Sequence, residues 1–207
     1  MPVRLDGLHD PELAGAVLAR AFQAEPLSAW QIPDDAERAV LLPGHFERVV
    51  RLAQIAGEVW RSEEYDAVAC WLGPGRWPPA TEELVEAGMT EVEALIGRDA
   101  WSRFEIVYSA LDDAHARAIH GDHWDLWVLG VLPEAQGNGV ASRLVAPMLE
   151  RLDRAGEVCY LETLDERTLR LYARLGFEVV IDETEPVSGM RFWCCVRAPQ
   201  GDGSRRS

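Results

Sequence analysis

The sequence predicts an α/β fold, because segments with helical spacing of apolar residues alternate with short apolar runs typical of strands. The clearest case is the apolar run from Leu126 to Val131, which leads through Pro133 into a glycine-containing loop and then, from Gly139, into a helical pattern. The second observation is the order of elements over about 124–197, which predicts strand, helix, strand, helix and two further strands. Both observations indicate a sheet with helices against it.

The first half of the chain is expected to be mostly helical. Asp10-Pro11-Glu12 is typical of a helix start, and a helix from there to about residue 23 follows. A second helix over about 36–56 should be interrupted near Pro43, because proline lacks a backbone N–H. The other elements expected here are a strand at 1–6, antiparallel strands at 58–61 and 67–72, and helices within 81–119, the clearest at 98–119.

The second half is expected to alternate strands and helices. The helix that starts at Gly139 should run to about 155, and Pro147 inside it should bend it or remove a hydrogen bond. Strands are expected at about 158–163, 177–181 and 191–197, with a helix at about 166–175. We expect one domain over 1–198 and a polar, disordered tail at 199–207.

The charge and hydropathy of the 207-residue chain limit its partners. Hydrophobic residues make up 48% and charged residues 27%, as in ordinary soluble proteins. No apolar stretch reaches the length of a membrane span, and the first twelve residues lack the apolar segment of a secretion signal. The net charge of −15 argues against nucleic acid and anionic membranes, and favours a cationic substrate. A solubility charge spread over the surface explains it equally well.

The cysteines and histidines predict no metal site. The four cysteines form no C-x-x-C pair, as expected for reduced thiols in a cytoplasmic protein. They are Cys70, Cys159, Cys194 and Cys195. The last two are adjacent in an expected strand and should face opposite sides of it. His115, His120 and His123 fit no compact zinc spacing, so a loop of solvated histidines is expected.

The loop from Gln136 to Gly139 carries the clearest chemical pattern. Glycine at 137 and 139 permits positive φ and close approach of a ligand to the backbone. Free backbone N–H groups and the positive end of the helix dipole would converge there, which suits a phosphate or pyrophosphate. Two alternatives remain: a helix that merely follows a turn, with Asn138 as its cap, and a dinucleotide fingerprint with Ser142 in place of its third glycine.

The pattern Val-x-Pro-x-x-Gln-Gly-x-Gly-x-Ala at residues 131–141 resembles the cofactor-binding motif of the GCN5-related N-acetyltransferase (GNAT) superfamily. The Leu-Tyr-Ala-Arg-Leu-Gly-Phe run at 171–177 resembles its second motif. With Leu-Glu-Thr at 161–163 and Trp193-Cys194, the arrangement looks most like the branch containing puromycin N-acetyltransferase. The matches cover about 123–180. The resemblance implies a twisted mixed β-sheet, flanked by helices and splayed between its fourth and fifth strands to admit acetyl-coenzyme A (acetyl-CoA).

The resemblance also implies the cofactor residues. In the family the loop amides bind the pyrophosphate, and the pantetheine arm pairs with the preceding strand. The corresponding residues are Leu129, Gly130, Val131, Gln136, Gly137, Asn138, Gly139, Val140 and Ala141. Thr168 stands where many relatives carry an asparagine near the pantetheine, so this contact departs from the family pattern.

Two residues are expected to move protons. Tyr172 occupies the place of a family general acid, which would protonate the departing thiolate; the alternative is a core aromatic. Glu162 is the first choice for the base that deprotonates the amine, and a structural carboxylate paired with an arginine is an equal alternative. His123 and Asp125 are reserves for the base.

The acceptor site is expected to use aromatic and acidic residues of the first half. Trp30, Trp71 and Trp77 could line it or belong to the core, and Glu25 could hold an ammonium group or lie in a solvated loop. The prediction is an acetyl-CoA-dependent N-acetyltransferase that transfers acetyl to a primary amine of a small molecule, a drug or metabolite, by direct attack on the thioester. It would act as a monomer or homodimer. The alternatives are a protein or peptide N-acetyltransferase and a non-catalytic acyl-CoA-binding regulatory domain.

Overall fold

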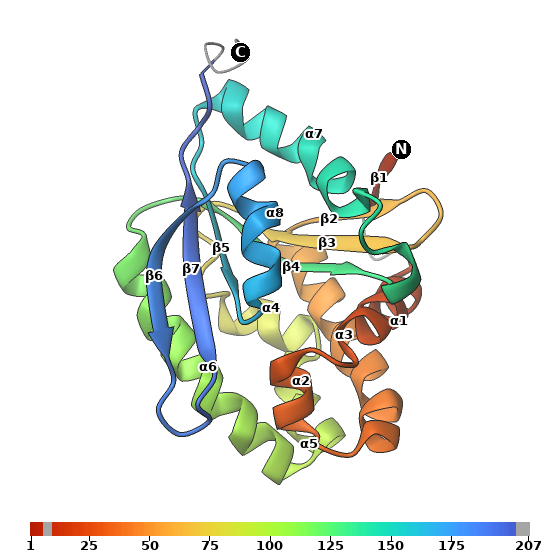
Figure 1. Ribbon diagram of the computed structural model, residues 1–207. Helices are drawn as coiled ribbons and strands as arrows, with labels where there is room; N and C mark the ends of the chain where they lie inside the picture. Colours follow the sequence, from red (N-terminus) through yellow and green to blue (C-terminus); the bar gives the residue numbers. More distant parts are fainter. Residues whose placement is uncertain (6–9, 202–207) are drawn as a thin grey trace.

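The computed structural model describes residues 1–5 and 10–201. In this part of the chain a seven-stranded mixed sheet has the strand order β1-β2-β3-β4-β5-β7-β6, with helices on both faces (Figure 1). The strands are β1 (Pro2–Leu5), β2 (Gly57–Ser62), β3 (Ala67–Leu72), β4 (Trp124–Val131), β5 (Cys159–Thr163), β6 (Glu178–Thr184) and β7 (Arg191–Arg197). The predicted α/β class, with a mixed sheet flanked by helices, is confirmed.

The helices and short turns connect these strands. The α-helices are α1 (Pro11–Phe22), α2 (Pro26–Gln31), α3 (Asp35–Ala56), α4 (Thr81–Glu86), α5 (Val92–Ile96), α6 (Arg98–Ala118), α7 (Val140–Ala155) and α8 (Leu169–Arg174). The 3-10 turns are η1 (Met89–Glu91), η2 (Pro133–Ala135) and η3 (Glu166–Thr168). None of the described helices is long and apolar enough to cross a membrane.

The sheet splits between β4 and β5. These parallel strands pair at Trp124 with Cys159 and at Asp125 with Tyr160, and the described residues pair no further along. On its other side β4 pairs with β3 as far as Val131. The β5-facing edge of β4 beyond Asp125 therefore has unpaired backbone groups, as the predicted splaying requires.

Side-chain alternation along the strands builds a core on each face of the sheet. Ala67, Ala69 and Trp71 of β3 pack on the α7 side, whereas Val68 and Cys70 face α1 and α3. This two-layer burial holds β4 rigidly in the middle of the sheet, where its open edge meets the split.

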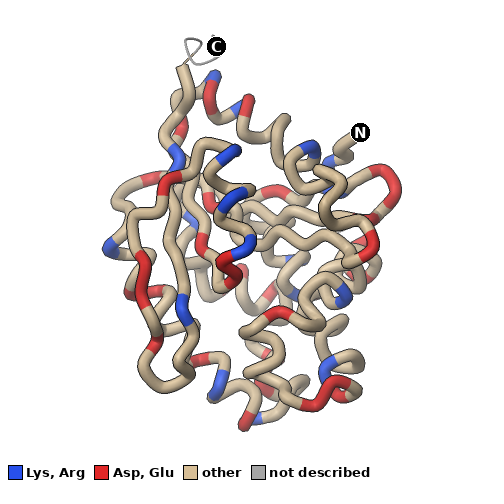
Figure 2. Tube along the Cα trace, viewed as in Figure 1, with Lys and Arg blue, Asp and Glu red and all other residues tan. Residues whose placement is uncertain are grey.

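Adjacent cysteines in β7 show the same alternation. Cys194 packs toward α6 and Cys195 toward α7 and α8, which confirms their predicted opposite orientation. All four cysteines are free thiols. Acidic residues are distributed over many outer elements rather than gathered in one patch (Figure 2).

Two prolines lie inside continuous helices. The expected interruption at Pro43 is wrong, since α3 is unbroken over Asp35–Ala56. Buried side chains on both sides of the proline, Leu42 and Phe46 among them, pack into the core and compensate for the missing hydrogen bond. Pro147 likewise lies within α7, whose buried stripe includes Leu144 and Met148.

The short helix α2 replaces the loop that was expected after α1. Glu25 caps it by accepting a hydrogen bond from the Ser28 backbone N–H at 3.0 Å, and Pro26 occupies its first turn. At the other end of the chain, the Gln200 backbone N–H donates to Asp153 at 2.7 Å. The rest of the expected tail, from residue 202, lies outside the described residues, as does residue 6 of the expected first strand.

Candidate active site

The glycine loop forms a cluster of backbone donors at the start of α7. Gly137 and Gly139 have φ of 78° and 73°, in the left-handed region that favours glycine. Gly139 is the N-terminal cap of α7, and no side chain caps it. Asn138 instead donates to the Ala135 carbonyl at 3.4 Å, so its expected role as a cap is wrong.

The backbone N–H groups from Gly137 to Ser142 have no protein acceptor within the described residues; we call them the loop amide cluster. Arg143 approaches this cluster and donates to the Asn138 carbonyl at 2.8 Å. A Cβ added at Gly137 would meet no described atom within 4 Å, so the space beside the loop is open. Unpaired donors, a helix N-terminus and open space together fit an anionic group such as a pyrophosphate.

The β4 edge continues from this loop into the split. Leu129, Gly130 and Val131 all line the cavity described below. The Val131 carbonyl accepts a hydrogen bond from the Gln136 side chain at 3.0 Å, which fixes the loop to the strand end. Gly130 also has a packing role, because a Cβ there would lie 2.7 Å from the Leu18 side chain.

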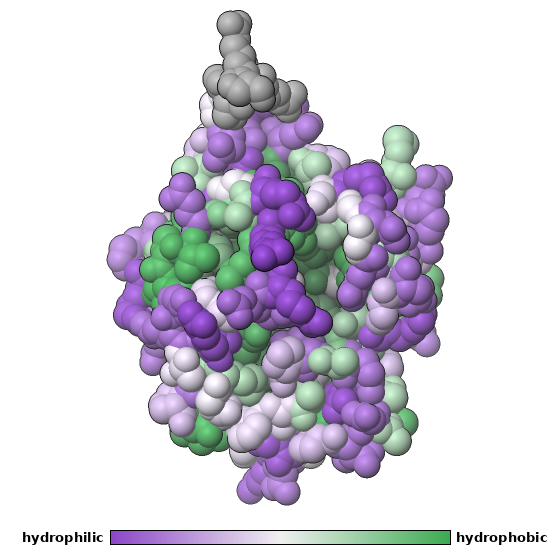
Figure 3. All heavy atoms as spheres, viewed as in Figure 1, coloured by the Kyte–Doolittle hydropathy of each residue, from purple (hydrophilic) through white to green (hydrophobic). Residues whose placement is uncertain are grey.

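A cavity of about 1810 Å³ occupies the split and extends beneath it. Its lining comes from the glycine loop, the β4 edge, α8, the end of α1, and the helices α2, α3 and α6. Apolar surface is visible in the recess beside α8 (Figure 3). The volume exceeds the roughly 300–1,000 Å³ of a pocket for one drug-sized ligand, so there is room for two reactants together.

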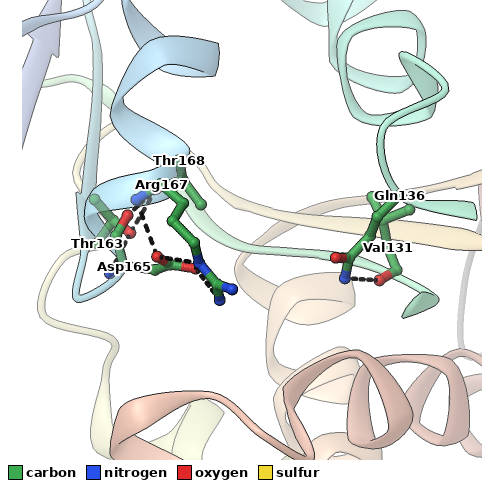
Figure 4. Close-up of polar contacts among 6 residues, drawn as sticks. All are labelled: Val131, Gln136, Thr163, Asp165, Arg167 and Thr168. Atoms are coloured by element: carbon green, nitrogen blue, oxygen red, sulfur yellow. Dashed lines mark hydrogen bonds and ion pairs between the residues drawn. The ribbon is translucent and has the colours of Figure 1, made fainter.

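Polar residues form the two rims of the split. Figure 4 draws five of them, Gln136, Thr163, Asp165, Arg167 and Thr168, together with Val131, whose backbone carbonyl is an acceptor. Asp165 accepts from the Arg167 guanidinium at 2.8 Å, and this pairing holds the pKa of Asp165 below its ordinary value. The Thr168 hydroxyl donates to the Asp165 carbonyl at 2.7 Å and lies 2.9 Å from the Thr163 hydroxyl. Both contacts of the Thr168 hydroxyl are therefore made within the local turn.

Tyr172 and Glu162 lie on facing elements that border the cavity. Tyr172, on α8, is 8% exposed, and its ring meets Phe177 edge-on at 6.0 Å. It both packs in the core and lines the cavity. Burial raises the pKa of its phenol, so the hydroxyl keeps its proton throughout the ordinary pH range.

Glu162, at the end of β5, is half-buried and faces the cavity. Burial raises its pKa to about 7, and the Tyr160 hydroxyl donates to it at 3.1 Å. Within the described residues no arginine contacts it, which removes the alternative of a structural ion pair. Asp112 of α6 also faces the cavity, and partial desolvation raises its pKa to about 6. Repulsion from the Asp112 carboxylate adds to the effect of burial on Glu162 and further favours its protonated state.

Some of the residues expected at the acceptor site line the cavity and others do not. Trp71 was wrong as a lining residue, because it is fully buried on the α7 side of the sheet, where strand alternation directs it. Trp30 does not line the cavity; its indole N–H donates to the Arg103 carbonyl at 3.4 Å. Glu25 does line the cavity, and burial raises its pKa. Trp77 lines it too, stacked on His115 at 4.9 Å.

The histidine expectation was wrong for His115. This residue is only 2% exposed, lies between Trp77 and Tyr160, and has its pKa lowered to about 3 by burial, so it is neutral. Its Nε2 atom lies 2.9 Å from Nε2 of His123. The described residues contain no group of three side chains suited to a metal ion.

Sequence reasoning missed most of the acceptor end. Tyr108 and Asp112 of α6 line the cavity, and Trp127 of β4 donates to the Tyr108 hydroxyl at 3.0 Å. The helix predicted at 98–119 carries Phe104 and Tyr108 at helical spacing, which was the one available indication. Nothing in the sequence pattern showed that this face points into a cavity rather than into the core.

The comparisons agree with this geometry. Residues 57–177 match the model of the acetyltransferase (GNAT) family, which is more than half of the chain. The chain therefore belongs to the GNAT family of N-acetyltransferases.

Individual proteins share the family and the fold. An uncharacterised N-acetyltransferase of Schizosaccharomyces pombe is 25% identical over 174 residues, which cover 81% of this chain and 70% of that one. A crystal structure from Corynebacterium glutamicum, described as histone acetyltransferase HPA2 and related acetyltransferase, has a TM-score of 0.65 and 21% identity, with 96% and 97% of the chains covered. The Drosophila melanogaster polyamine N-acetyltransferase, which catalyses formation of N-acetylagmatine, has a TM-score of 0.60 and 18% identity, with 96% and 99% covered.

Proposed function

We propose that this enzyme transfers an acetyl group from acetyl-CoA to a primary amine of a small molecule. The observation that carries the proposal is one continuous cavity that joins the loop amide cluster to Glu162 and Tyr172. The anion site at one end of the cavity would bind the cofactor, and the two proton-carrying groups in the middle would assist the transfer of the acetyl group.

The cofactor end uses backbone groups. The pyrophosphate of acetyl-CoA would accept hydrogen bonds from the loop amide cluster, where the helix dipole adds favourable charge. The pantetheine arm would pair with the open edge of β4 along Leu129, Gly130 and Val131 as an added strand does. Thr168 is a weaker contact, because its hydroxyl is already hydrogen-bonded.

Two side chains would handle protons. Bound acetyl-CoA supplies the activated thioester. Glu162, with a pKa of about 7, would accept a proton from the ammonium group of the acceptor, so that the nitrogen lone pair can form the new C–N bond. The C–S bond breaks, and Tyr172 would donate its proton to the sulfur. The nitrogen of the new amide would give up its second proton, which returns through solvent to the Tyr172 phenolate, and Glu162 would release the proton it holds to solvent.

Direct attack is favoured over an acyl-enzyme. The four cysteines are buried and none lines the cavity. Burial raises the pKa of every one, to about 12 at Cys194 and about 11 at Cys195, so little thiolate exists at neutral pH. The amine would therefore take the acetyl group directly from the thioester.

A small acceptor is favoured over a peptide. The helices α2 and α6 contact each other and both line the cavity below the split, which favours a compact acceptor there. The polyamine acetyltransferase among the structural neighbours acts on a small amine. A drug or metabolite acceptor, as in the puromycin N-acetyltransferase branch that the motifs resemble, fits this enclosure. We further propose a cytoplasmic enzyme with one catalytic domain over residues 1–198, working as a monomer or homodimer without nucleic acid or membrane partners.

The test is an assay of thiol release from acetyl-CoA with purified protein and a panel of amines, followed by mass analysis of the products. We expect amine-dependent release and an N-acetylated product. Release only with peptides would support the protein N-acetyltransferase alternative. Tight acetyl-CoA binding without amine-dependent release would support the regulatory-domain alternative.

A further inference from the structure

Two buried polar side chains at the far end of the cavity lack hydrogen-bond partners. Gln31, the last residue of α2, is 3% exposed, and His45 of α3 is 8% exposed. Both line the cavity, and Nε2 of Gln31 and Nδ1 of His45 are enclosed without a partner in the described structure. We call these residues the distal polar pair. Buried polar groups are nearly always hydrogen-bonded, so these two atoms lack the partner that such groups ordinarily have.

The distal polar pair lies around one turn of α6. The His45 ring meets the Phe104 ring edge-on at 6.2 Å. The backbone carbonyl of Gln31 accepts from the Arg103 side chain at 2.9 Å, next to Phe104 in the chain. His45 is therefore beside Phe104, and the end of α2 at Gln31 is held by the residue that precedes Phe104 in the chain.

Both groups are uncharged. Burial lowers the pKa of His45 to about 4, so its imidazole is neutral at physiological pH. A half-turn of the Gln31 amide exchanges its oxygen and nitrogen without changing the shape of the side chain, and the neutral His45 imidazole can carry its proton on either ring nitrogen. Either residue can therefore present a donor or an acceptor to an uncharged partner.

The surrounding helices hold the pair in place. Arg38 donates to the Ile32 carbonyl just after α2 and to the Gln23 carbonyl just before it. On the other side, the Trp30 indole donates to the Arg103 carbonyl. These contacts fix α2 between α3 and α6, so the unpaired groups are not merely the ends of a loose segment.

Aromatic side chains separate the pair from the reacting end. Phe104 and Tyr108 of α6 stack at 4.6 Å, and both line the cavity. Asp112 lies beyond them on the same helix and faces Glu162. From Phe104 to Asp112 the rise of an α-helix over eight residues is about 12 Å. The acceptor part of the cavity thus has the carboxyl groups of Glu162 and Asp112 beside the reaction centre, flat aromatic walls next, and the distal polar pair at the far end.

We propose that the acceptor is a primary amine on an aromatic body that carries an uncharged hydrogen-bonding group, such as a ring hydroxyl, at its far end. Gln31 and His45 bind that group and set the specificity. This inference rests on the proposed function, because it names the acceptor class of the same site.

A linear diamine fits this end less well. A second ammonium group needs a free carboxylate, and the acidic residues near the distal pair are engaged. Glu25 caps α2, and Glu93 pairs with Arg98 at 3.3 Å. Glu105 is exposed at the cavity rim and is the remaining candidate for such a role.

The experiment compares kcat/KM for 2-phenylethylamine, its 4-hydroxy derivative and butane-1,4-diamine with acetyl-CoA. For the wild-type enzyme we expect the hydroxylated amine to exceed the unsubstituted one by about threefold to tenfold, the value of one neutral hydrogen bond. In Gln31→Leu and His45→Phe this ratio should fall toward one. His120→Phe, in an exposed loop, is the matched control and should keep the wild-type ratio.

Thermal melting separates binding from a purely structural role. Gln31→Leu replaces an unpaired buried amide with an apolar side chain of similar size, so its Tm should equal or exceed that of the wild type. A structural role would instead lower the Tm and reduce both rates equally. If His45→Phe does not fold, the Gln31→Leu ratio still decides the question.

Three results would overturn the inference. Equal rates with and without the ring hydroxyl in the wild type would remove the distal site. Preference for the diamine, abolished by Glu105→Gln, would place a cation there instead. Both results would leave the proposed function standing, whereas no thiol release with any amine would overturn that function and this inference with it.

Discussion

The two ends of the cavity recognise their ligands in different ways. At the cofactor end the groups available are backbone N–H groups around Gly137 and Gly139, exposed and set by φ angles in the left-handed region. At the acceptor end they are buried side chains from α2, α3 and α6, which are far apart in the sequence. A backbone site leaves a local glycine pattern in the sequence, whereas a side-chain site can change its specificity without leaving one.

The largest difference between the two ends is expected from a substitution at Gly137. A leucine there would project into open space beside the loop amide cluster and should weaken acetyl-CoA binding by at least about a hundredfold. Gly156→Leu is the matched control, because Gly156 also has a left-handed φ and no neighbour of its Cβ position, at the other end of α7. Both variants should lose about 1–2 kcal/mol of stability. Calorimetry that shows equal acetyl-CoA affinity in the two would contradict the backbone site.

Tyr172→Phe should produce the next largest effect. It keeps the aromatic packing and removes the proton donor, so kcat should fall by about 10²–10³-fold with little change in KM. Because burial raises the pKa of this phenol, the wild-type rate should show no alkaline fall from Tyr172 below pH 10. A wild-type kcat in the variant would make Tyr172 a core aromatic only.

Glu162→Gln should lower kcat/KM by roughly tenfold to a hundredfold, since solvent can still deprotonate some of the amine. The wild-type rate should rise with pH to about 7, where this carboxyl loses its proton, and this limb should disappear in the variant. An unchanged pH profile would assign the base to another group, such as Asp112.

The Glu162→Gln substitution should raise the stability of the fold although it lowers the activity. The folded pKa of Glu162, about 7, exceeds its ordinary value, so the protonated carboxyl favours the folded state. That contribution is complete below the unfolded pKa and is lost as the pH rises through 7. Thermal melting should therefore show Glu162→Gln gaining Tm relative to the wild type between pH 5 and pH 8. A constant difference over that range would contradict the raised pKa.

Thr168→Val should have the smallest effect on catalysis. The hydroxyl bonds Asp165 and Thr163 within the turn, so acetyl-CoA affinity should change by no more than about threefold. Its loss should cost about 1–2 kcal/mol of stability, measured by denaturant unfolding. A large loss of affinity without a loss of stability would restore Thr168 as a cofactor contact.

The sequence predicted the strand, the glycine loop and the helix start for a physical reason, whereas the split of the sheet was implied by the motif resemblance. Apolar runs and glycines directly encode a strand, a tight loop and a helix start, so Val131 to Gly139 could be interpreted without knowledge of tertiary contacts. The motif resemblance then placed Tyr172 and Glu162 at the same cavity, which the structure shows; their chemical roles stay predictions.

The acceptor end was harder to predict because burial decides it. Trp71 and Trp77 look alike in sequence, yet strand alternation buries the first under α7 and the second lies against the cavity. His115 looked like part of a solvated loop, but it is the last inward-facing residue of α6 and stacks between aromatic rings. Gln31 gave no pattern at all, since its position depends on how α2 is held against α6.

Direct transfer between two reactants bound together is tested by the initial-rate pattern when the concentrations of acetyl-CoA and the best amine acceptor are varied together. Both reactants are proposed to occupy one cavity at once, with direct attack on the thioester and no acyl-enzyme. We expect double-reciprocal plots of the initial rates to give lines that intersect, as a ternary complex requires. Parallel lines, with acetyl transferred to the protein in the absence of amine, would contradict it.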